Sequence, residues 1–115
     1  MNNNEFQQIN WLDPWYPIPQ DISSWVETEL QREIIAGHPL YGLKVQAIAR
    51  RSGYDDYLFF LPNNKLPLAV VHLTFQKETT VNFPHTSFYN SLDDWIENDM
   101  KVSHLEYIED AVSEI

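Results

Sequence analysis

The sequence predicts a single α+β domain, residues 1–115, in which helices cover one face of an antiparallel sheet to form two layers. Three observations predict this class. Apolar residues recur at helical spacing near both ends of the chain and alternate in its middle part. The length is sufficient for one hydrophobic core, and sixteen aromatic side chains are available to fill it. The predicted order is an arm, one helix, three strands and two helices.

Residues 1–20 are predicted to form an arm rich in aromatic residues and proline. Its three central prolines exclude a regular helix there, because each lacks a backbone N–H and restricts the residue before it. The side chains of Trp11 and Trp15 need apolar surface to cover. We therefore expect the arm to fold back over the edge of the core. An aromatic lip that binds a ligand is the alternative.

A helix is predicted between Asp21 and Gly37. The apolar side chains that recur at every fourth position and form one stripe are Ile22, Val26, Leu30 and Ile34. Gly37 supplies a C-terminal stop, and Pro39 prevents the helix from continuing soon after it.

Three strands follow, predicted over Leu43–Arg51, Tyr57–Leu61 and Leu68–Phe75. The first shows period two, and the third is the most apolar segment of the chain, as expected of a central strand. Short connections between consecutive strands predict an antiparallel meander. Lys77–Asn90 contains a proline and has no clear period, so it is predicted to be a loop. A fourth, edge strand over Thr79–Phe83 is an open alternative.

The alternation also predicts which side chains share a face of the sheet. Ala47 and Ala49 of the first strand are expected on the same side as Val71 of the third strand, the side that the helices cover. His72 and Thr74 are expected together on the opposite face, where the arm is one possible cover.

Two separate helices are predicted after the loop. Ser91 opens the first of them, which places Trp95 and Met100 on one apolar side. The segment Ser103–Glu106 has the pattern of a capping box, so a second helix is expected to begin there. The apolar side chains of that second helix are Leu105, Ile108, Val112 and Ile115.

The charge of the chain is strongly acidic and unevenly distributed. Seven basic and seventeen acidic residues leave a net charge of −10, and the stretch from Asp93 to Glu114 has eight acids and one base. Such a surface repels nucleic acid and anionic lipid and attracts a basic protein, so neither nucleic acid nor a membrane is predicted as a partner. A solvated helix face that keeps the protein soluble is the alternative. The acids predicted to contact a basic partner are Asp94, Glu97, Asp99, Glu106 and Asp110.

The absence of cysteine excludes a disulfide framework, thiol catalysis and cysteine-based zinc sites. The remaining candidate metal ligands are His38, His72, His85 and His104, with Asp55 and Asp56. No two of the histidines have His-x-x-x-His spacing, so neither a metal nor a cofactor is predicted. The N-terminus has no signal-peptide pattern, and no apolar run approaches the roughly 18 residues of a membrane span, so a cytoplasmic protein is expected.

A catalytic alternative rests on two short motifs. His72 and Thr74 on the third strand resemble half of the signature of two-histidine phosphoesterases, and His85 with Ser87 supplies a second candidate half. In that family each histidine acts as acid or base and each hydroxyl holds phosphate, which the resemblance would imply for these four residues. Only thirteen positions separate the two histidines here, and the second motif falls in a predicted loop. We therefore predict a protein that is not an enzyme.

Four segments resemble a set of small, uncharacterised bacterial proteins: Gly37–Gly42, Ala47–Arg51, Asp55–Phe59 and Ala69–Phe75. That set shares a His-Pro-Leu segment, an Asp-Asp pair before a strand, and a Val-His-Leu-Thr-aromatic strand. The resemblance covers residues 25–100 and implies no catalytic residue. Small acidic bacterial proteins of this kind are often immunity proteins or antitoxins that block a basic toxin.

Together these observations predict a non-enzymatic protein-binding domain of the immunity or antitoxin type. Its expected partner is a basic protein, for example a toxin. Two alternatives remain open: the phosphoesterase, and a small-molecule binder whose pocket lies between the aromatic arm and the sheet, near Trp11 and Trp15.

Overall fold

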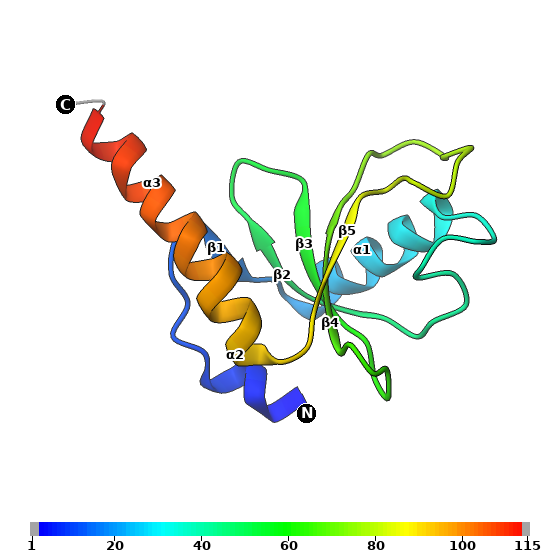
Figure 1. The fold of residues 1–115 in the computed structure, drawn as a ribbon, viewed down its shortest axis with the longest axis horizontal. Helices are drawn as coiled ribbons and strands as arrows, with labels where there is room; N and C mark the ends of the chain where they lie inside the picture. Colours follow the sequence, from blue (N-terminus) through cyan, green and yellow to red (C-terminus); the bar gives the residue numbers. More distant parts are fainter. Residues whose placement is uncertain (1–2, 114–115) are drawn as a thin grey trace.

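A computed structural model describes residues 3–113 and shows an α+β fold built on one five-stranded antiparallel sheet (Figure 1). The strands are β1 (Trp15–Pro17), β2 (Gln46–Arg51), β3 (Asp56–Phe60), β4 (Leu68–His72) and β5 (Thr86–Tyr89). Each strand pairs with the next one along the chain, so the sheet is a continuous meander. The predicted α+β class is confirmed, and the three predicted strands correspond to β2, β3 and β4.

The two edge strands extend the sheet beyond what the sequence predicted. β1 comes from the arm, which also contains a short 3-10 helix, η1 (Asn3–Gln8). The other edge strand, β5, lies at Thr86–Tyr89 and not at Thr79–Phe83, so the loop predicted over 77–90 ends earlier than expected. The four residues of β5 are too few to show a period that distinguishes a strand from a loop. Pairing with Leu68–Val71 of β4 stabilises the strand.

The predicted N-terminal helix is confirmed as α1 (Gln20–Glu33), which packs on one face of the sheet. Val26 and Leu30 are fully buried there. The helix ends at Glu33, earlier than Gly37, because Ile34 already has an extended backbone with φ −87° and ψ 148°. The buried side chains of β2, β3 and β4 that face α1 include Ala47, Tyr57, Phe59, Ala69 and Val71.

The second face of the sheet is also covered, so the two-layer prediction is wrong and the molecule has three layers. Trp95 and Met100 of the C-terminal helix and Trp15 of the arm are buried against this face. The Trp95 ring meets the Trp15 ring edge-on, with centroids 5.2 Å apart. The cause is visible in β3, where Leu58 and Phe60 are buried on this side while their neighbours are buried on the α1 side. A strand with apolar residues on both sides needs cover on both faces.

A β-bulge between Ala47 and Ala49 changes which side chains of β2 share a face. Ala47 lies in the core beneath α1, whereas Ala49 lies in the core beneath the C-terminal helix, so the prediction that both share a face is wrong. A bulge inserts one residue and so reverses the alternation that follows it. As a result Arg50 lies over the Tyr57 ring, while Arg51 turns towards the C-terminal helix.

The two predicted C-terminal helices form one continuous rod. α2 (Leu92–Trp95) passes through a π-helical turn, η2 (Ile96–Met100), into α3 (Lys101–Ser113), which runs away from the sheet (Figure 1). Ser91 caps the start, with its Oγ accepting the Asp94 N–H at 3.0 Å. The predicted break at Ser103 is absent: Ser103 is buried, and its hydroxyl donates to Asp99 one turn earlier instead of capping a new helix. None of the helices in residues 3–113 has both the length and the hydropathy needed to cross a membrane.

Candidate functional site

The sheet-facing side of the C-terminal helix is fixed by a polar group around Asp99. Its carboxylate accepts the Tyr89 hydroxyl at 2.9 Å and the Ser103 hydroxyl at 3.1 Å. Burial raises the pKa of the Asp99 carboxyl, and burial together with the adjacent Asp99 raises the pKa of the Tyr89 hydroxyl. The structure therefore places Asp99 in an anchoring position, whereas the sequence predicted a surface contact.

Two of the other predicted contact acids form local pairs near the start of the rod. Asp94 accepts the Asn90 backbone N–H at 3.0 Å and the Asn98 side chain at 2.7 Å. Glu97 lies on the open surface and pairs with Lys101, one turn later, at 2.6 Å. Exposed pairs of this kind contribute little to stability, so Glu97 remains available to a partner.

Glu106 joins α3 to the end of β2. Its carboxylate lies 3.2 Å from the Arg51 guanidinium, which also stacks over the Tyr54 ring at 4.0 Å. A second carboxylate, that of Asp56, lies 4.0 Å from the same guanidinium. The Arg51 side chain is only 17% exposed, so it forms a largely buried link between the sheet and the projecting helix.

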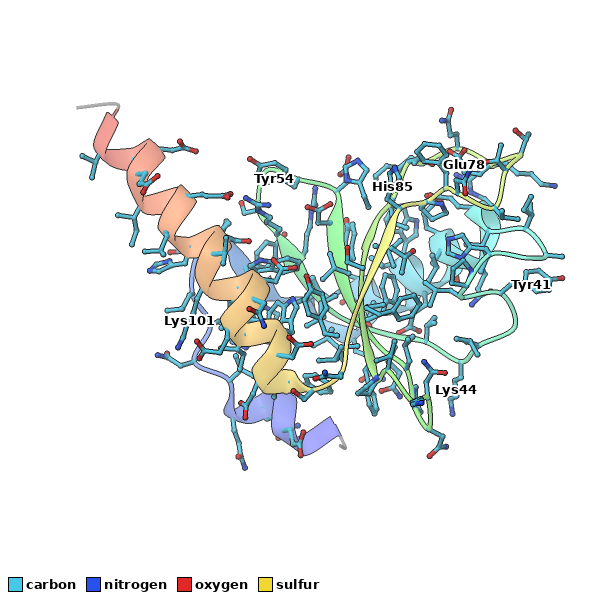
Figure 2. The ribbon with its side chains drawn as sticks, viewed as in Figure 1. Tyr41, Lys44, Tyr54, Glu78, His85 and Lys101 are labelled. Atoms are coloured by element: carbon cyan, nitrogen blue, oxygen red, sulfur yellow. The ribbon has the colours of Figure 1, made fainter. Side chains whose placement is uncertain are left out.

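The outer side of α3 carries exposed apolar side chains. Leu105, Ile108 and Val112 are 61%, 42% and 63% exposed, and their spacing of three and four places them on one side of the helix. We call these three residues the α3 stripe; Ile115, the fourth apolar residue predicted with them, lies outside the described residues. Side chains along the last turns of α3 stand clear of the rest of the chain (Figure 2). Glu109, which is exposed, lies beside the stripe, whereas Asp110 lies on the opposite side of the helix.

A second polar group lies at the end of β3, β4 and β5. The His72 Nδ1 is 2.7 Å from an Asp56 carboxylate oxygen, and the imidazole is mostly exposed. The His72 N–H donates to the His85 carbonyl at 3.0 Å, continuing the register that pairs β4 with β5. The two exposed histidines therefore stand opposite each other on neighbouring strands, and by the same alternation Ser87 shares their face. Figure 2 shows His85 at the same end of the sheet as Tyr54.

Thr74 does not belong to this group, so the prediction that it shares a face with His72 is wrong. β4 ends at His72, and the alternation does not continue beyond it. The Thr74 hydroxyl donates to Glu33 at 3.0 Å and lies 2.8 Å from a Glu78 carboxylate oxygen. Phe75 then takes a left-handed backbone, with φ at 60°, and stacks on Trp25. The hydroxyl that the phosphoesterase alternative assigns to phosphate is thus turned towards α1.

Glu33 is a buried carboxyl that the sequence analysis missed. It is fully buried and accepts the backbone N–H groups of Thr74 and Phe75, each at 2.9 Å. Burial, and then the hydrogen bond with Glu29, raise the pKa of the Glu33 carboxyl to about 7. A signal was present in the sequence, because Glu29 and Glu33 follow Val26 at helical spacing and so fall on its buried side.

The other histidines and the paired aspartates have structural roles. The His38 Nδ1 accepts the Leu40 N–H at 3.0 Å, which leaves Nε2 to donate to a backbone carbonyl at 2.9 Å. The His104 Nδ1 lies 2.7 Å from a carbonyl of the arm. Asp55 pairs with Arg50 at 3.4 Å, apart from the neighbouring Asp56. Within the described part of the chain, no three potential ligands come together as a metal site would require.

Two large cavities are present, and neither His72 nor His85 lines them. One of about 780 Å³ lies beside the turn between β3 and β4, where Lys65 and Asp93 give it charges of both signs. The other, of about 700 Å³, lies between the arm, α1 and β2 and is lined by Trp11 but not by Trp15. The pocket that the small-molecule alternative expects beside the aromatic arm therefore corresponds in position to the second cavity.

No protein-family model matches the chain, and no curated protein or solved structure is significantly similar to it. The geometry of the described residues is therefore the basis for a functional proposal.

Proposed function

We propose that this protein binds a basic, amphipathic segment of another protein along α3, as an immunity protein or antitoxin would, and that it is not an enzyme. The observation that supports this most strongly is the exposure of the α3 stripe, Leu105, Ile108 and Val112, on a helix that stands away from the sheet. Exposed apolar surface of this kind on a folded protein is typical of an interaction site. Each such side chain that a partner covers contributes about 1 kcal/mol.

The charge around the stripe favours a basic partner. Lys101 is the one Lys or Arg between residues 93 and 113, a segment with seven acids. A second copy of this chain would bring two acidic helices together, which like-charge repulsion opposes. A segment with Lys and Arg beside apolar side chains would match both the stripe and the adjacent Glu109, and the negative field of the acidic helix would speed its approach.

The phosphoesterase alternative keeps only part of its predicted site. His72, His85 and Ser87 share one face, and the contact with Asp56 orients the His72 imidazole as a general base requires. The Thr74 hydroxyl instead lies within hydrogen-bond distance of the Glu33 and Glu78 carboxylates. Hydrolysis of bis(p-nitrophenyl) phosphate that is lost in His72→Ala and His85→Ala would favour this alternative. If the protein is a binding domain and not an enzyme, we expect no such hydrolysis.

Affinity for two peptides tests the proposed function. The first is a fluorescein-labelled helical peptide of Leu and Lys in amphipathic order, and the second is a scrambled peptide of the same composition. We expect fluorescence anisotropy to show binding of the ordered peptide and much weaker binding of the scrambled one. Ile108→Ser should weaken binding about 5-fold or more, because it removes apolar surface from the interface.

The chain offers a matched control in Ile22, which is on α1 and 44% exposed, close to the value for Ile108. Ile22→Ser should leave the affinity unchanged. Glu109→Lys should weaken binding and reduce its dependence on salt. Equal affinity for the two peptides, or equal effects of the two Ile→Ser variants, would contradict the proposed function.

A further inference from the structure

The cavity of about 700 Å³ between the arm, α1 and β2 has the size of a small-molecule site. Its apolar wall includes Ile9 and Trp11 of the arm and Ile48 of β2. Its polar wall includes Glu27 of α1 and Gln46 of β2. This combination of an apolar wall and a few polar groups is typical of sites that bind a small organic ligand. The cavity is separate from the α3 stripe.

Glu27 sets the charge of the cavity. Among the described lining residues it is the one with a formal charge. Its Oε2 accepts the Ala47 backbone N–H at 2.8 Å and lies 3.1 Å from the Ser23 hydroxyl, whose shorter contact is with the Ala47 carbonyl, and these contacts fix the position of the carboxylate. Neither of these bonds uses Oε1, and an ionised carboxylate accepts more than two hydrogen bonds. No Lys, Arg or His within residues 3–113 forms an ion pair with it.

Trp11 supplies an aromatic wall. It is half-buried, and its ring is held against Trp95 by an edge contact with centroids 6.0 Å apart. The face of an indole attracts a cation within about 6 Å of its centroid. An anion would be repelled by Glu27, and a hydrocarbon would desolvate the carboxylate without replacing its hydrogen bonds to water.

We propose that this cavity binds a small organic amine, with the ammonium group on the Glu27 carboxylate and the apolar body against Trp11 and Ile48. The carboxylate and the aromatic wall then act on the same ligand from two sides. The site is independent of the proposed binding along α3, so either can fail without the other.

Calorimetric titration of the unmodified protein with 2-phenylethylamine and with 2-phenylethanol tests the proposal. The two probes have nearly the same shape, and only the first is cationic at pH 7. We expect the amine to bind and the alcohol to bind at least about 10-fold more weakly, as the loss of an ion pair and a cation–π contact implies. No binding of the amine at millimolar concentration, or equal affinity for both probes, would overturn the proposal without any variant.

Two variants locate the binding. Glu27→Gln retains an oxygen that can accept the Ala47 N–H but removes the charge, and Trp11→Leu retains an apolar wall but removes the ring. Each variant should lower the affinity for the amine about 5- to 10-fold and leave the affinity for the alcohol nearly unchanged. Glu109→Gln on α3 makes the same change in net charge and should have no effect. If the amine affinity falls equally in Glu27→Gln and Glu109→Gln, the amine responds to overall charge and the assignment to this cavity is wrong.

Discussion

Arg51 at the end of β2 lies 3.2 Å from Glu106 of α3, fifty-five positions later in the chain. This ion pair is where the projecting helix is tied to the sheet beyond the buried contacts of Trp95, Met100 and Ser103. The α3 stripe, which begins at Leu105 next to Glu106, is exposed on another side of the helix. The proposed function thus depends on a helix whose first half is fixed and whose second half is exposed.

The two ends of this ion pair are expected to differ in their effect on stability. Glu106 is mostly exposed, so Glu106→Gln should lower the free energy of unfolding by less than about 1 kcal/mol. Arg51→Ala should lower it by about 2 kcal/mol, because it also removes the contact with the Tyr54 ring and packing by the side-chain stem. Urea unfolding of both variants measures the difference. Equal effects would show that Arg51 has no role beyond the pair.

Glu33 should make stability depend on pH. The pKa of the Glu33 carboxyl is about 7 in the folded protein, against 4.5 for an unperturbed glutamate. The folded state therefore binds the proton more tightly than the unfolded state. The contribution of this group is therefore most favourable below pH 4.5 and is lost as the pH rises from 4.5 to 7. The loss amounts to at most about 3 kcal/mol.

Unfolding of the wild type and of Glu33→Gln at pH 5 and pH 8 isolates this contribution. The variant keeps an oxygen that can accept the Thr74 N–H at 2.9 Å, and it has no proton to lose. Its stability relative to the wild type should be higher at pH 8 than at pH 5. A difference that is the same at both pH values would contradict the raised pKa.

Two tryptophans provide a matched test of the three-layer packing. Trp95 is fully buried between the sheet and the arm, whereas Trp25 is 55% exposed on α1. Trp95→Ala should lower the free energy of unfolding by about 3–5 kcal/mol. Trp25→Ala should lower it by about 1 kcal/mol or less, since the side chain is more than half exposed and its ring contact is the stacking on Phe75. Similar losses in thermal or urea unfolding would show that the second face is not a packed core.

The parts of the fold that the sequence predicted are those with a repeated local pattern. α1 has apolar residues at every fourth position, Ile22, Val26 and Leu30, and β3 and β4 are short apolar runs bounded by turns. The parts that it did not predict depend on contacts between distant segments. β5 needs β4 as a partner, and the bulge at Ala47 and Ala49 reverses a face without any change in residue type.

Local signals also misled the prediction where tertiary packing overrides them. Ser103 begins a capping-box pattern, yet its hydroxyl bonds to Asp99 within a continuous rod, because the π turn brings both residues to the sheet-facing side. The alternation of side chains that predicted a shared face for His72 and Thr74 stops at His72, where β4 ends. For the candidate site, the acidic character of the C-terminal segment was evident in the sequence. The position of α3 away from the sheet could be seen only in the structure.

Mapping the binding surface by NMR tests the proposed function most directly. Unlabelled amphipathic Leu/Lys peptide is added to ¹⁵N-labelled protein, and the amide shifts of every residue are followed. Binding along α3 predicts that the largest shifts lie within Lys101–Ser113 and are strongest near Leu105, Ile108 and Val112. Largest shifts at the end of the sheet near His72 and His85, or no shift in α3 at saturation, would contradict the proposed binding.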